Sequence, residues 1–410
     1  MEHIIQSLLD TDFYKFTMGQ VVFKEFRNVP VRYAFHFRTK GINLADFIIE
    51  RELRQELDHV MTLNFNNSDL HYLRGTNEYS ERMFYEDYLD FLRILRLPDY
   101  SLKFENGLQL EFKGPWPSTI YWETYALSII SELYYRALLK KMSRFERDLV
   151  FAEGKIRLNK KIQILKGIPD ITISDFATRR RFARRWQEYA ITTLAEEMPS
   201  SQFLGTSNVK LAMDYGLLPM GTSAHEMYMG MSGIMHADNE DIRQSHNATM
   251  RLWYKHYGHG LSIALADNYG SDFFFRDMSQ KQAEQWKGVR QDSGDPVAFG
   301  EKTIRFYERY NINPREKLIV FSDGLDVPTM VKLYNTFHNR IQITFGWGTN
   351  LSNDLGLAPI SMVVKLVESN GHGTVKLSDN IAKAIGKPED IERFKRIFSY
   401  DSTYETACTY

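Results

Sequence analysis

Residues 288–310, GVRQDSGDPVAFGEKTIRFYERY, contain the pattern that decides the expected fold. A short strand-like run passes into a turn rich in glycine and aspartate, and an amphipathic helix follows the turn directly. Residues 318–339, LIVFSDGLDVPTMVKLYNTFHN, repeat the same order of strand, polar turn and helix. Strands that alternate with helices in this way favour a parallel sheet.

The same unit recurs outward from these two stretches, beginning at about residue 170. Its other turns read ITISDFATRRRF (171–182), FLGTSNV (203–209), LPMGTSAHE (218–226), IALADNYGS (263–271) and ITFGWGTNL (343–351). Seven or so units suggest that the sheet closes into a barrel, and the uneven spacing of the turns predicts an irregular barrel.

The first part of the chain has a different pattern. Strand-like runs such as VRYAFHFRT (31–39) are mixed with helices, and no unit repeats, which predicts an α+β domain. STIYWETYALSIISELYYRALLKK (118–141) has apolar residues three to four apart and predicts a long helix with a buried face. The expected fold class is therefore α/β, with an N-terminal α+β domain over residues 1–140 and an irregular α/β barrel over residues 141–410. The C-terminal tail of the barrel domain can pack back on the first domain.

The composition argues against several classes of protein. The 51 lysines and arginines almost balance the 52 aspartates and glutamates, so the overall charge favours neither a nucleic-acid nor an anionic-membrane partner. No run approaches the roughly 20 apolar residues of a membrane span, and charges interrupt the stretch MEHIIQSLLDTDFYKF, unlike a signal peptide. We therefore expect a cytoplasmic protein with no membrane partner. The single cysteine, Cys408, excludes an intrachain disulfide and a cysteine zinc cluster.

The polar turns of the repeated unit are expected to meet. In a parallel barrel the loops after the strands gather at one end, where active sites lie. A lone histidine is more often a satisfied residue at a core edge than a functional group. His225, however, shares its place in the unit with other polar, aromatic or glycine residues, namely Phe176, Arg179, Ser207, Asp267, Arg290, Asp292, Asp323 and Gly348.

Two further patterns indicate an anionic ligand. Arg290 and Asp292 leave the same face of an extended strand and can grip an anionic or hydroxylated ligand, although an ion pair that caps the barrel is an equal alternative. FSDGLD (321–326) and FGWGTNLSND (345–354) bring glycines to helix starts, where backbone N–H groups can hold a phosphate. Because ordinary turns also need glycine, each signal is weak alone. Their succession late in the barrel favours a phosphate site.

Basic and aromatic residues also carry alternatives. Arginines at the helix start in TRRRFARRW (178–186) oppose the helix dipole, which hints at a bound anion. Arg179 is expected to reach the barrel mouth, whereas Arg184 and Arg185 are expected on a solvated face. RNA binding is the rival interpretation, but the neutral net charge and the lack of a nucleic-acid motif count against it. Tyr14, in LLDTDFYKFTMGQ (8–20), is either a core ring or a stacking platform for a flat ligand.

Taken together, these motifs and VKLSDNIAKAIG (375–386) resemble the nicotinate phosphoribosyltransferase family, in the right order from about residue 8 to about residue 390. The resemblance implies a type II phosphoribosyltransferase that forms nicotinate mononucleotide and pyrophosphate from nicotinate and phosphoribosyl pyrophosphate in NAD salvage. It also implies coupling to ATP hydrolysis, Mg²⁺ held mainly by substrate phosphates without a protein metal site, and a homodimer with active sites at its interface.

The roles of individual residues follow from the same resemblance. His225 is implied to be the histidine that ATP phosphorylates, and Asp267 is implied to hold its second ring nitrogen. Phe176 and a Tyr14 from the partner chain are implied to sandwich the pyridine. The other implied substrate contacts are Arg179 and Arg290 with phosphates and base, Asp292 with the ribose hydroxyls, Asp323 beside them, and Gly324, Gly348 and Thr349 with the 5′-phosphate.

Substrate choice rests on Ser207. Relatives that use nicotinamide carry an aspartate at the matching position, which would repel the carboxylate of nicotinate, so serine favours nicotinate. The alternatives are a nicotinamide- or quinolinate-using enzyme and a barrel that binds nucleotides without turnover. The chain departs from the family pattern at Ala177, where glycine is usual, and at Trp347, where a smaller residue is common.

Overall fold

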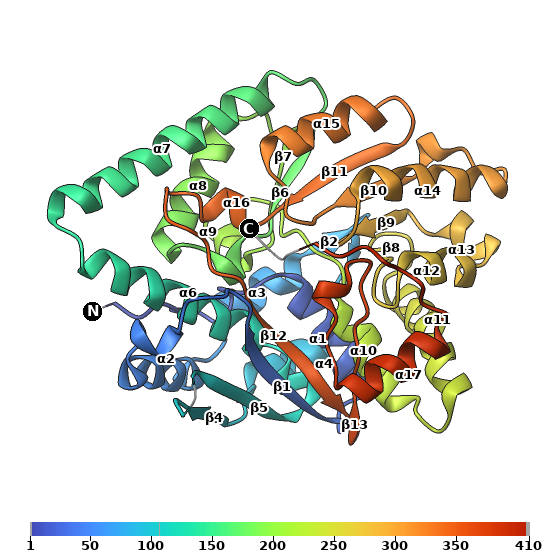
Figure 1. Cartoon of the computed structure of the whole chain (residues 1–410), viewed down its shortest axis with the longest axis horizontal. Coiled ribbons are helices and arrows are strands. Elements are labelled where there is room, and N and C mark those ends of the chain that lie inside the picture. The colour runs from blue at the N-terminus through green and yellow to red at the C-terminus, as the bar shows by residue number, and fades with distance from the viewer. Residues whose placement is uncertain (1, 106, 407–410) are drawn as a thin grey trace.

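A computed structural model describes residues 2–105 and 107–406 of the 410-residue chain. Cys408 lies outside the described residues. Two sheets organise the fold (Figure 1), one antiparallel and one parallel. No helix in the described part of the chain is long and apolar enough to cross a membrane.

The antiparallel sheet has the strand order β13-β12-β1-β5-β4. Its strands are β1 (Pro30–Phe37), β4 (Tyr100–Lys103), β5 (Gln109–Pro115), β12 (Met362–Ser369) and β13 (His372–Gly373). A separate hairpin joins β2 (Asn77–Glu78) and β3 (Glu81–Arg82). The accompanying helices are α1 (Tyr14–Glu25), α2 (Glu50–Thr62), α3 (Asn67–Gly75), α4 (Glu86–Arg93), α5 (Trp116–Thr119) and α6 (Trp122–Lys140), with a 3₁₀ turn at Leu44–Asp46.

Strand β12 enters this sheet from far along the chain. It pairs with β1 from Val31 to Phe37, with a register irregularity after Arg32. The predicted boundary falls between α6 and α7 (Arg144–Lys166), but residues 362–373 return to the antiparallel sheet. Segments from the first and the last third of the sequence therefore form the antiparallel sheet, which faces the parallel sheet.

The parallel sheet has the order β7-β6-β11-β10-β9-β8. Its strands are β6 (Ile173–Asp175), β7 (Phe203–Thr206), β8 (Ile263–Leu265), β9 (Gly288–Gln291), β10 (Leu318–Phe321) and β11 (Gln342–Trp347). The helices are α7, α8 (Arg184–Glu197), α9 (Val209–Tyr215), α10 (His225–Ile234), α11 (Asn239–Tyr257), α12 (Ser271–Asp277), α13 (Gln280–Gln285), α14 (Pro296–Arg309), α15 (Val327–Phe337), α16 (Thr349–Ser352) and α17 (Pro388–Ile397). Short 3₁₀ turns lie at Thr178–Arg180, Pro314–Glu316 and Ile381–Lys383.

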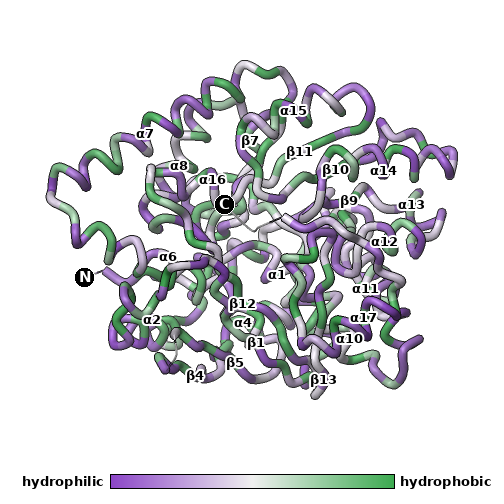
Figure 2. The backbone as a smooth tube through the Cα atoms, in the orientation of Figure 1, coloured by the Kyte–Doolittle hydropathy of each residue, from purple (hydrophilic) through white to green (hydrophobic). Residues whose placement is uncertain are grey.

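The two stretches that predicted the parallel sheet fold as expected. Asp295 caps α14 by accepting from Ala298 N, and Asp326 caps α15 by accepting from Thr329 N. Each helix has proline in its first turn, where no backbone N–H partner is lost. Hydrophobic and hydrophilic residues alternate along the length of α7 (Figure 2).

The prediction of seven strand units is wrong at LPMGTSAHE. In the described residues this stretch has no strand and joins β7 only through a single parallel bridge between Thr206 and Pro219. Backbone bonds from Met220 N to Thr206 O (2.9 Å) and from Thr206 N to Leu218 O (3.1 Å) form this bridge, so Pro219 faces away from β7 and has no N–H to offer a strand on its other side. The parallel sheet therefore has six strands, and residues 217–222 lie beside its β7 edge.

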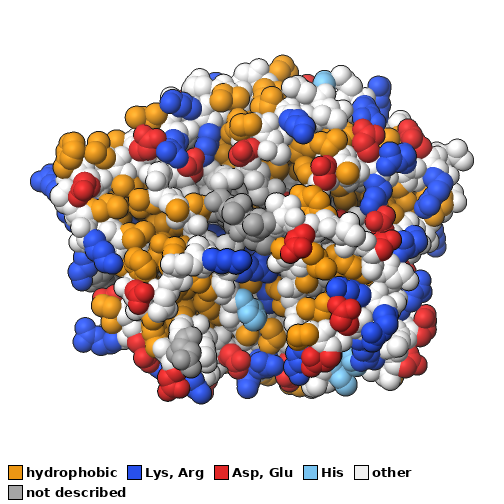
Figure 3. Space-filling view, in the orientation of Figure 1, with side chains coloured by type: hydrophobic (Ala, Val, Ile, Leu, Met, Phe, Trp, Pro, Cys, Tyr) orange, Lys and Arg blue, Asp and Glu red, His pale blue; other side chains and the backbone are white. Residues whose placement is uncertain are grey.

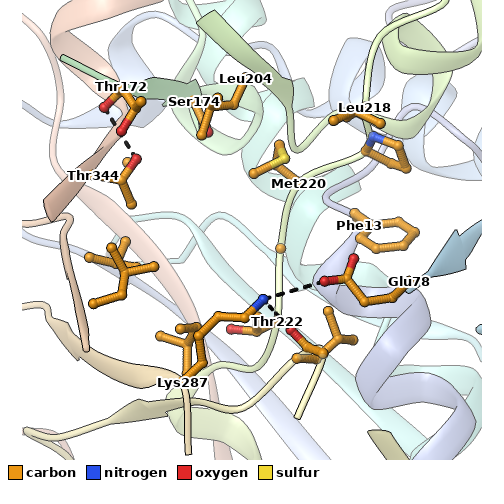
Figure 4. A pocket seen from close by; sticks show the side chains of 18 of the residues that line it. Phe13, Glu78, Thr172, Ser174, Leu204, Leu218, Met220, Thr222, Lys287 and Thr344 are labelled. Atoms are coloured by element: carbon orange, nitrogen blue, oxygen red, sulfur yellow. Dashed lines mark hydrogen bonds and ion pairs between the residues drawn. The ribbon is translucent and has the colours of Figure 1, made fainter. Parts of the chain in front are cut away.

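The interior of the parallel sheet encloses a cavity of about 940 Å³. Side chains from all six parallel strands and from residues 217–222 line it. Figure 4 shows small side chains, Thr172, Ser174 and Thr344, on one side, facing Met220 and Leu218 across the cavity. Barrel interiors are usually filled by branched residues, so these small side chains leave the space open. At one end the cavity is bordered by Phe176, Arg290 and Gly346, which also line the second pocket described next.

Candidate active site

A second pocket lies at the carboxyl ends of the parallel strands, where they face the antiparallel sheet. The central hollow of the face in Figure 3 displays lysine and arginine side chains. Most of the predicted site residues line this pocket together, namely Tyr14, Phe176, Arg179, His225, Arg290, Asp292, Asp323, Gly324, Gly348 and Thr349. Asp267 and Ser207 are not among the lining residues.

His225 is the first residue of α10 and is held by acids that follow β8 and β9. Its Nε2 lies 2.8 Å from Asp267 Oδ1 and 3.7 Å from Asp292 Oδ2. Burial, with the charge of Lys376, lowers the pKa of His225 to about 4, although Asp267 acts in the opposite direction. The imidazole is therefore neutral at neutral pH and can act as a nucleophile.

Asp267 is buried and stays ionised. Burial alone would raise its pKa, but Lys376 and His225 hold the pKa of Asp267 well below its ordinary value. Its Oδ2 accepts from Ser293 Oγ at 2.5 Å and lies 3.6 Å from Lys376 Nζ. This carboxylate can fix the imidazole orientation and stabilise a positive charge on the ring.

His225, Asp267 and Asp292 also form a group that could hold a cation. Among the described residues, their ligand atoms lie within 4.8 Å of one another. Arg290 and His225 outweigh the effect of burial and lower the pKa of Asp292 to about 2, so this carboxylate is ionised. Carboxylate oxygens suit Mg²⁺, and Asp292 is the carboxylate of this group that lines the pocket.

Tyr14 and Phe176 form the two aromatic walls of the pocket. Phe176 follows β6, and Tyr14 begins α1. Phe13 N donates to Ser207 O at 2.7 Å, and Asp12 bridges to Asn208, so the start of α1 is fixed beside β7 of the same chain. Tyr14 thus lines the same pocket as Phe176 in the described chain, and a tyrosine from a partner chain stays a prediction of the family resemblance.

Ser207 does not face the pocket. Its hydroxyl donates to Asp12 Oδ1 at 2.7 Å. The other oxygen of Asp12 accepts from Tyr14 OH at 3.0 Å and lies 3.4 Å from Arg179 Nε. An acidic side chain, that of Asp12, therefore lies directly beside Ser207, although the serine itself carries no charge. The specificity argument built on Ser207 is not supported by this geometry.

Arg290 provides a different recognition group. It lies where the pocket meets the interior cavity. Its NH1 donates to Ser223 O at 2.9 Å, while its Nε is buried and has no hydrogen-bond partner among the described residues. A buried guanidinium N–H without a partner can donate to a ligand carboxylate.

The turns predicted to bind phosphate lie on the opposite side of the pocket from His225's helix. Gly324 has φ of +57°, which favours glycine, and it precedes α15. Asp323 pairs with Lys383, and burial raises its pKa although Lys383 opposes this effect. Gly348 and Thr349 form the start of α16.

Five basic residues line the pocket without having been predicted as site residues. They are Arg38, Arg180, Lys365, Lys376 and Lys383. Lys376 and Lys383 lie in VKLSDNIAKAIG, a stretch that carried the resemblance without a role for either lysine. Lys365 lies on β12, where no local pattern marks it, and burial lowers its pKa to about 8. These cations supply most of the positive charge expected for a phosphate pocket.

Most arginines of the cluster at residues 178–186 form ion pairs within the protein. Arg181 is fully buried and its guanidinium meets both oxygens of Asp10 at 2.7 and 2.8 Å. Arg184 and Arg185 pair with Glu2 at the surface. These contacts account for the cluster without an RNA partner.

The two departures from the family pattern fit the structure. Ala177 has φ of −93°, which does not require glycine. Trp347 is fully buried and does not line the pocket, and Lys161 Nζ lies 5.6 Å from its ring. Neither residue obstructs the site.

Comparisons with known proteins agree with this architecture. The model of the nicotinate phosphoribosyltransferase (NAPRTase) family matches residues 171–402, and the model of the NAPRTase N-terminal domain matches residues 9–131. A nicotinate phosphoribosyltransferase structure from Vibrio cholerae has a TM-score of 0.88 and 32% identity, covering 97% of this chain and 94% of that chain. The enzyme from Porphyromonas gingivalis has a TM-score of 0.84 and 30% identity, covering 97% and 100%. A putative nicotinate phosphoribosyltransferase from Saccharomyces cerevisiae has a TM-score of 0.86 and 28% identity, covering 98% and 100%.

Proposed function

The chain belongs to the nicotinate phosphoribosyltransferase family, and from that premise we propose how its residues make nicotinate mononucleotide. The family reaction joins nicotinate to phosphoribosyl pyrophosphate and releases pyrophosphate. The single observation that carries the proposal is that two aromatic rings, His225, Asp292 and two glycine turns line one pocket.

Nicotinate binds with its ring between Tyr14 and Phe176. Its carboxylate accepts from Arg290 Nε, the buried donor at the inner end of the pocket. A site that leaves this donor unpaired discriminates against bases without an anionic group at that position. Arg290 thus takes the specificity role that the sequence had assigned to Ser207.

Phosphoribosyl pyrophosphate binds toward the glycine turns and the lysines. The turns at Gly324 and Gly348 hold the 5′-phosphate, and Asp292 accepts from the ribose hydroxyls. Lys365 and Lys376 face the diphosphate. When Mg²⁺ binds with the diphosphate, Asp292 would be the carboxylate that helps to hold it, and the ion would supply further neutralisation of charge on the leaving group.

The transfer step exchanges one bond to ribose C1 for another. The C1–O bond to the diphosphate breaks with its electron pair leaving on oxygen, and the pyridine nitrogen lone pair forms the C1–N bond from the opposite face. The cations of the pocket stabilise the negative charge that develops on the leaving diphosphate. Tyr14 and Phe176 keep the base aligned for attack.

ATP coupling passes through His225. The neutral ring donates from Nε2–H to Asp267, so its Nδ1 lone pair is the nucleophile toward the γ-phosphorus of ATP. The Nδ1–P bond forms as the bond between the γ-phosphorus and the bridging oxygen breaks, and ADP leaves with that electron pair. Asp267 then stabilises the positive charge of the phosphorylated ring.

A homodimer remains a prediction from the family resemblance. Because Tyr14 completes the pocket of its own chain, we propose that dimer formation is not required to assemble the aromatic pair.

The substrate assignment is tested by offering nicotinate, nicotinamide and quinolinate separately with Mg²⁺ and phosphoribosyl pyrophosphate, while measuring mononucleotide and pyrophosphate. Nicotinate is expected to be the preferred base. Preference for nicotinamide would overturn the role of Arg290, whereas preference for quinolinate, which also carries a carboxylate at that position, would overturn the choice of nicotinate as substrate. Tight phosphoribosyl pyrophosphate binding without pyrophosphate release from any base would instead indicate a non-catalytic nucleotide-binding barrel.

A further inference from the structure

Lys15 lies at the centre of a buried charge cluster outside the pocket lining. Its side chain is fully buried, and its Nζ lies 2.6 Å from Glu123 Oε2 and 2.6 Å from Glu226 Oε2. Burial acts to lower the pKa of Lys15, but Glu123 and Glu226 raise it above its ordinary value. The lysine is therefore charged and bridges two carboxylates.

One of these carboxylates holds the helix that carries the histidine. Glu226 follows His225 in the first turn of α10, and its Oε1 accepts from Trp116 Nε1 at 3.0 Å and from Tyr33 OH. These donors come from α5 and β1, and Figure 1 places α10 beside α1 and the antiparallel sheet. Residues of the N-terminal half of the molecule thus bind Glu226, the residue next to His225. The acids that contact the imidazole instead follow strands of the parallel sheet.

The other carboxylate leads to the substrate pocket. Glu123 Oε1 lies 3.3 Å from Arg179 NH1 and 3.6 Å from Lys365 Nζ. Lys15, Lys365 and Arg179 hold the pKa of Glu123 well below its ordinary value although burial opposes them. Both cations line the pocket, so the bridge from Glu226 through Lys15 to Glu123 joins the histidine to groups that meet the substrates.

We propose that Lys15, Glu123 and Glu226 are positioning residues that fix the position of His225 relative to Arg179 and Lys365. In this way they link phosphorylation of the histidine to the substrate pocket. The inference rests on the proposed ATP coupling. A displacement of about 1 Å in such an arrangement can lower a rate about 100-fold. Removing one partner of a buried ion pair leaves an uncompensated charge, which favours such a displacement.

The test uses the full chain with Lys15→Met, Glu226→Gln and the double variant. Glu226→Gln keeps an oxygen for Trp116 and Tyr33 but loses the charge that meets Lys15. Glu25→Gln is the matched control, because Glu25 lies on the same helix α1 and pairs with Lys255 and His256 away from the cluster. Three quantities are measured: the rate of phosphohistidine formation from γ-labelled ATP, the stimulation of nicotinate mononucleotide synthesis by ATP, and the thermal midpoint of unfolding.

Each single variant is expected to slow phosphohistidine formation about 10- to 100-fold and to lose ATP stimulation. The double variant also neutralises the Glu226 carboxylate that Lys15→Met leaves without its lysine, so its thermal midpoint should recover from that of Lys15→Met toward wild type while ATP stimulation stays lost. The control should behave as wild type. ATP stimulation within twofold of wild type in the single variants, or its recovery together with the thermal midpoint in the double variant, would overturn the positioning role.

The wild-type arm separates this inference from the proposed function. If wild-type protein forms no phosphohistidine, the ATP coupling fails and the positioning role falls with it. If wild-type protein is labelled and the variants are labelled at the same rate, only the positioning role fails.

Discussion

The His225 and Asp267 pair shows how burial prepares a nucleophile. The histidine lies at a helix start, where it could have been solvated, but Asp267 and the surrounding packing remove it from water. Its pKa of about 4 keeps the ring neutral over the physiological range. The sequence identified both residues through motif resemblance, and the structure adds that Nε2 is the nitrogen engaged by Asp267.

The lowered pKa of His225 predicts a pH-dependent contribution to stability. Below pH 6.5, the ordinary pKa of histidine, His225 of the unfolded chain binds a proton. In the folded chain His225 binds this proton only near its lowered pKa of about 4. The contribution is therefore full above pH 6.5 and is lost as pH falls toward 4, on the order of 3 kcal/mol in total. Denaturant unfolding of wild type and His225→Asn across this range measures it. A difference between the two proteins that does not vary with pH would contradict the burial of a neutral ring.

Arg290 predicts the choice of base. Arg290→Gln removes the charged donor, which should cost about 1.5–3 kcal/mol of transition-state stabilisation with nicotinate. This loss lowers kcat/KM for nicotinate roughly 10- to 150-fold, and kcat/KM for nicotinamide should fall less. Initial rates with both bases test this, and Arg185→Gln at the exposed surface is the control. An unchanged kcat/KM for nicotinate in Arg290→Gln would mean that another group binds the carboxylate.

Ser207 marks what residue-level prediction could not include. The chemical reason for a serine was sound, since an aspartate there would repel a carboxylate. The pattern could not show that Asp12, close in space but far in sequence, accepts from this serine. The same lack of spatial information hid Lys15, Lys365 and Glu226, because each acts through contacts with distant segments.

At the scale of elements, local signals predicted helices better than strand partners. The aspartate and proline starts of α14 and α15 determine their own caps, so residues 288–339 fold as expected. The pairing of β12 with β1 joins segments more than 300 residues apart, and neither sequence specifies its partner. LPMGTSAHE resembled a strand unit, but it joins β7 through one bridge, and Pro219 has no N–H to offer a strand on its other side.

Helix α10 provides a prediction at this scale. A Cβ at Gly230 would lie 2.0 Å from the Trp116 ring, so Gly230→Ala must push α10 away from α5. We expect a loss of about 1–3 kcal/mol in unfolding free energy together with weaker ATP stimulation. Urea unfolding and ATP-dependent synthesis measure the two effects. Gly75→Ala, at a position with open space, is the control, and equal behaviour of the two variants would contradict the tight packing.

At the scale of the whole molecule, the pocket lies between two sheets that are both drawn from one chain. The parallel sheet contributes Phe176, Arg290 and the phosphate turns, and the antiparallel side contributes Tyr14 and Lys365. The expectation of a partner's tyrosine came from resemblance alone. Whether a chain folds its first helix onto its own barrel depends on contacts such as the Asp12 bridge to Asn208, which no motif encodes.

This arrangement predicts that activity does not depend on dimerisation. Specific activity should stay constant when the protein is diluted across any dimer dissociation that sedimentation detects, because each chain keeps its own Tyr14. Tyr14→Ala should lower nicotinate kcat/KM in every state of association. Activity that falls in step with dissociation would show that a partner chain completes the site.

The central claim is that His225 couples ATP to nicotinate mononucleotide synthesis, and its most direct test compares synthesis by wild type and His225→Ala with and without ATP, in the presence of Mg²⁺, phosphoribosyl pyrophosphate and nicotinate. ATP should stimulate synthesis by wild type and should have no stimulating effect on His225→Ala. Equal stimulation of both proteins, or no stimulation of wild type, would contradict it.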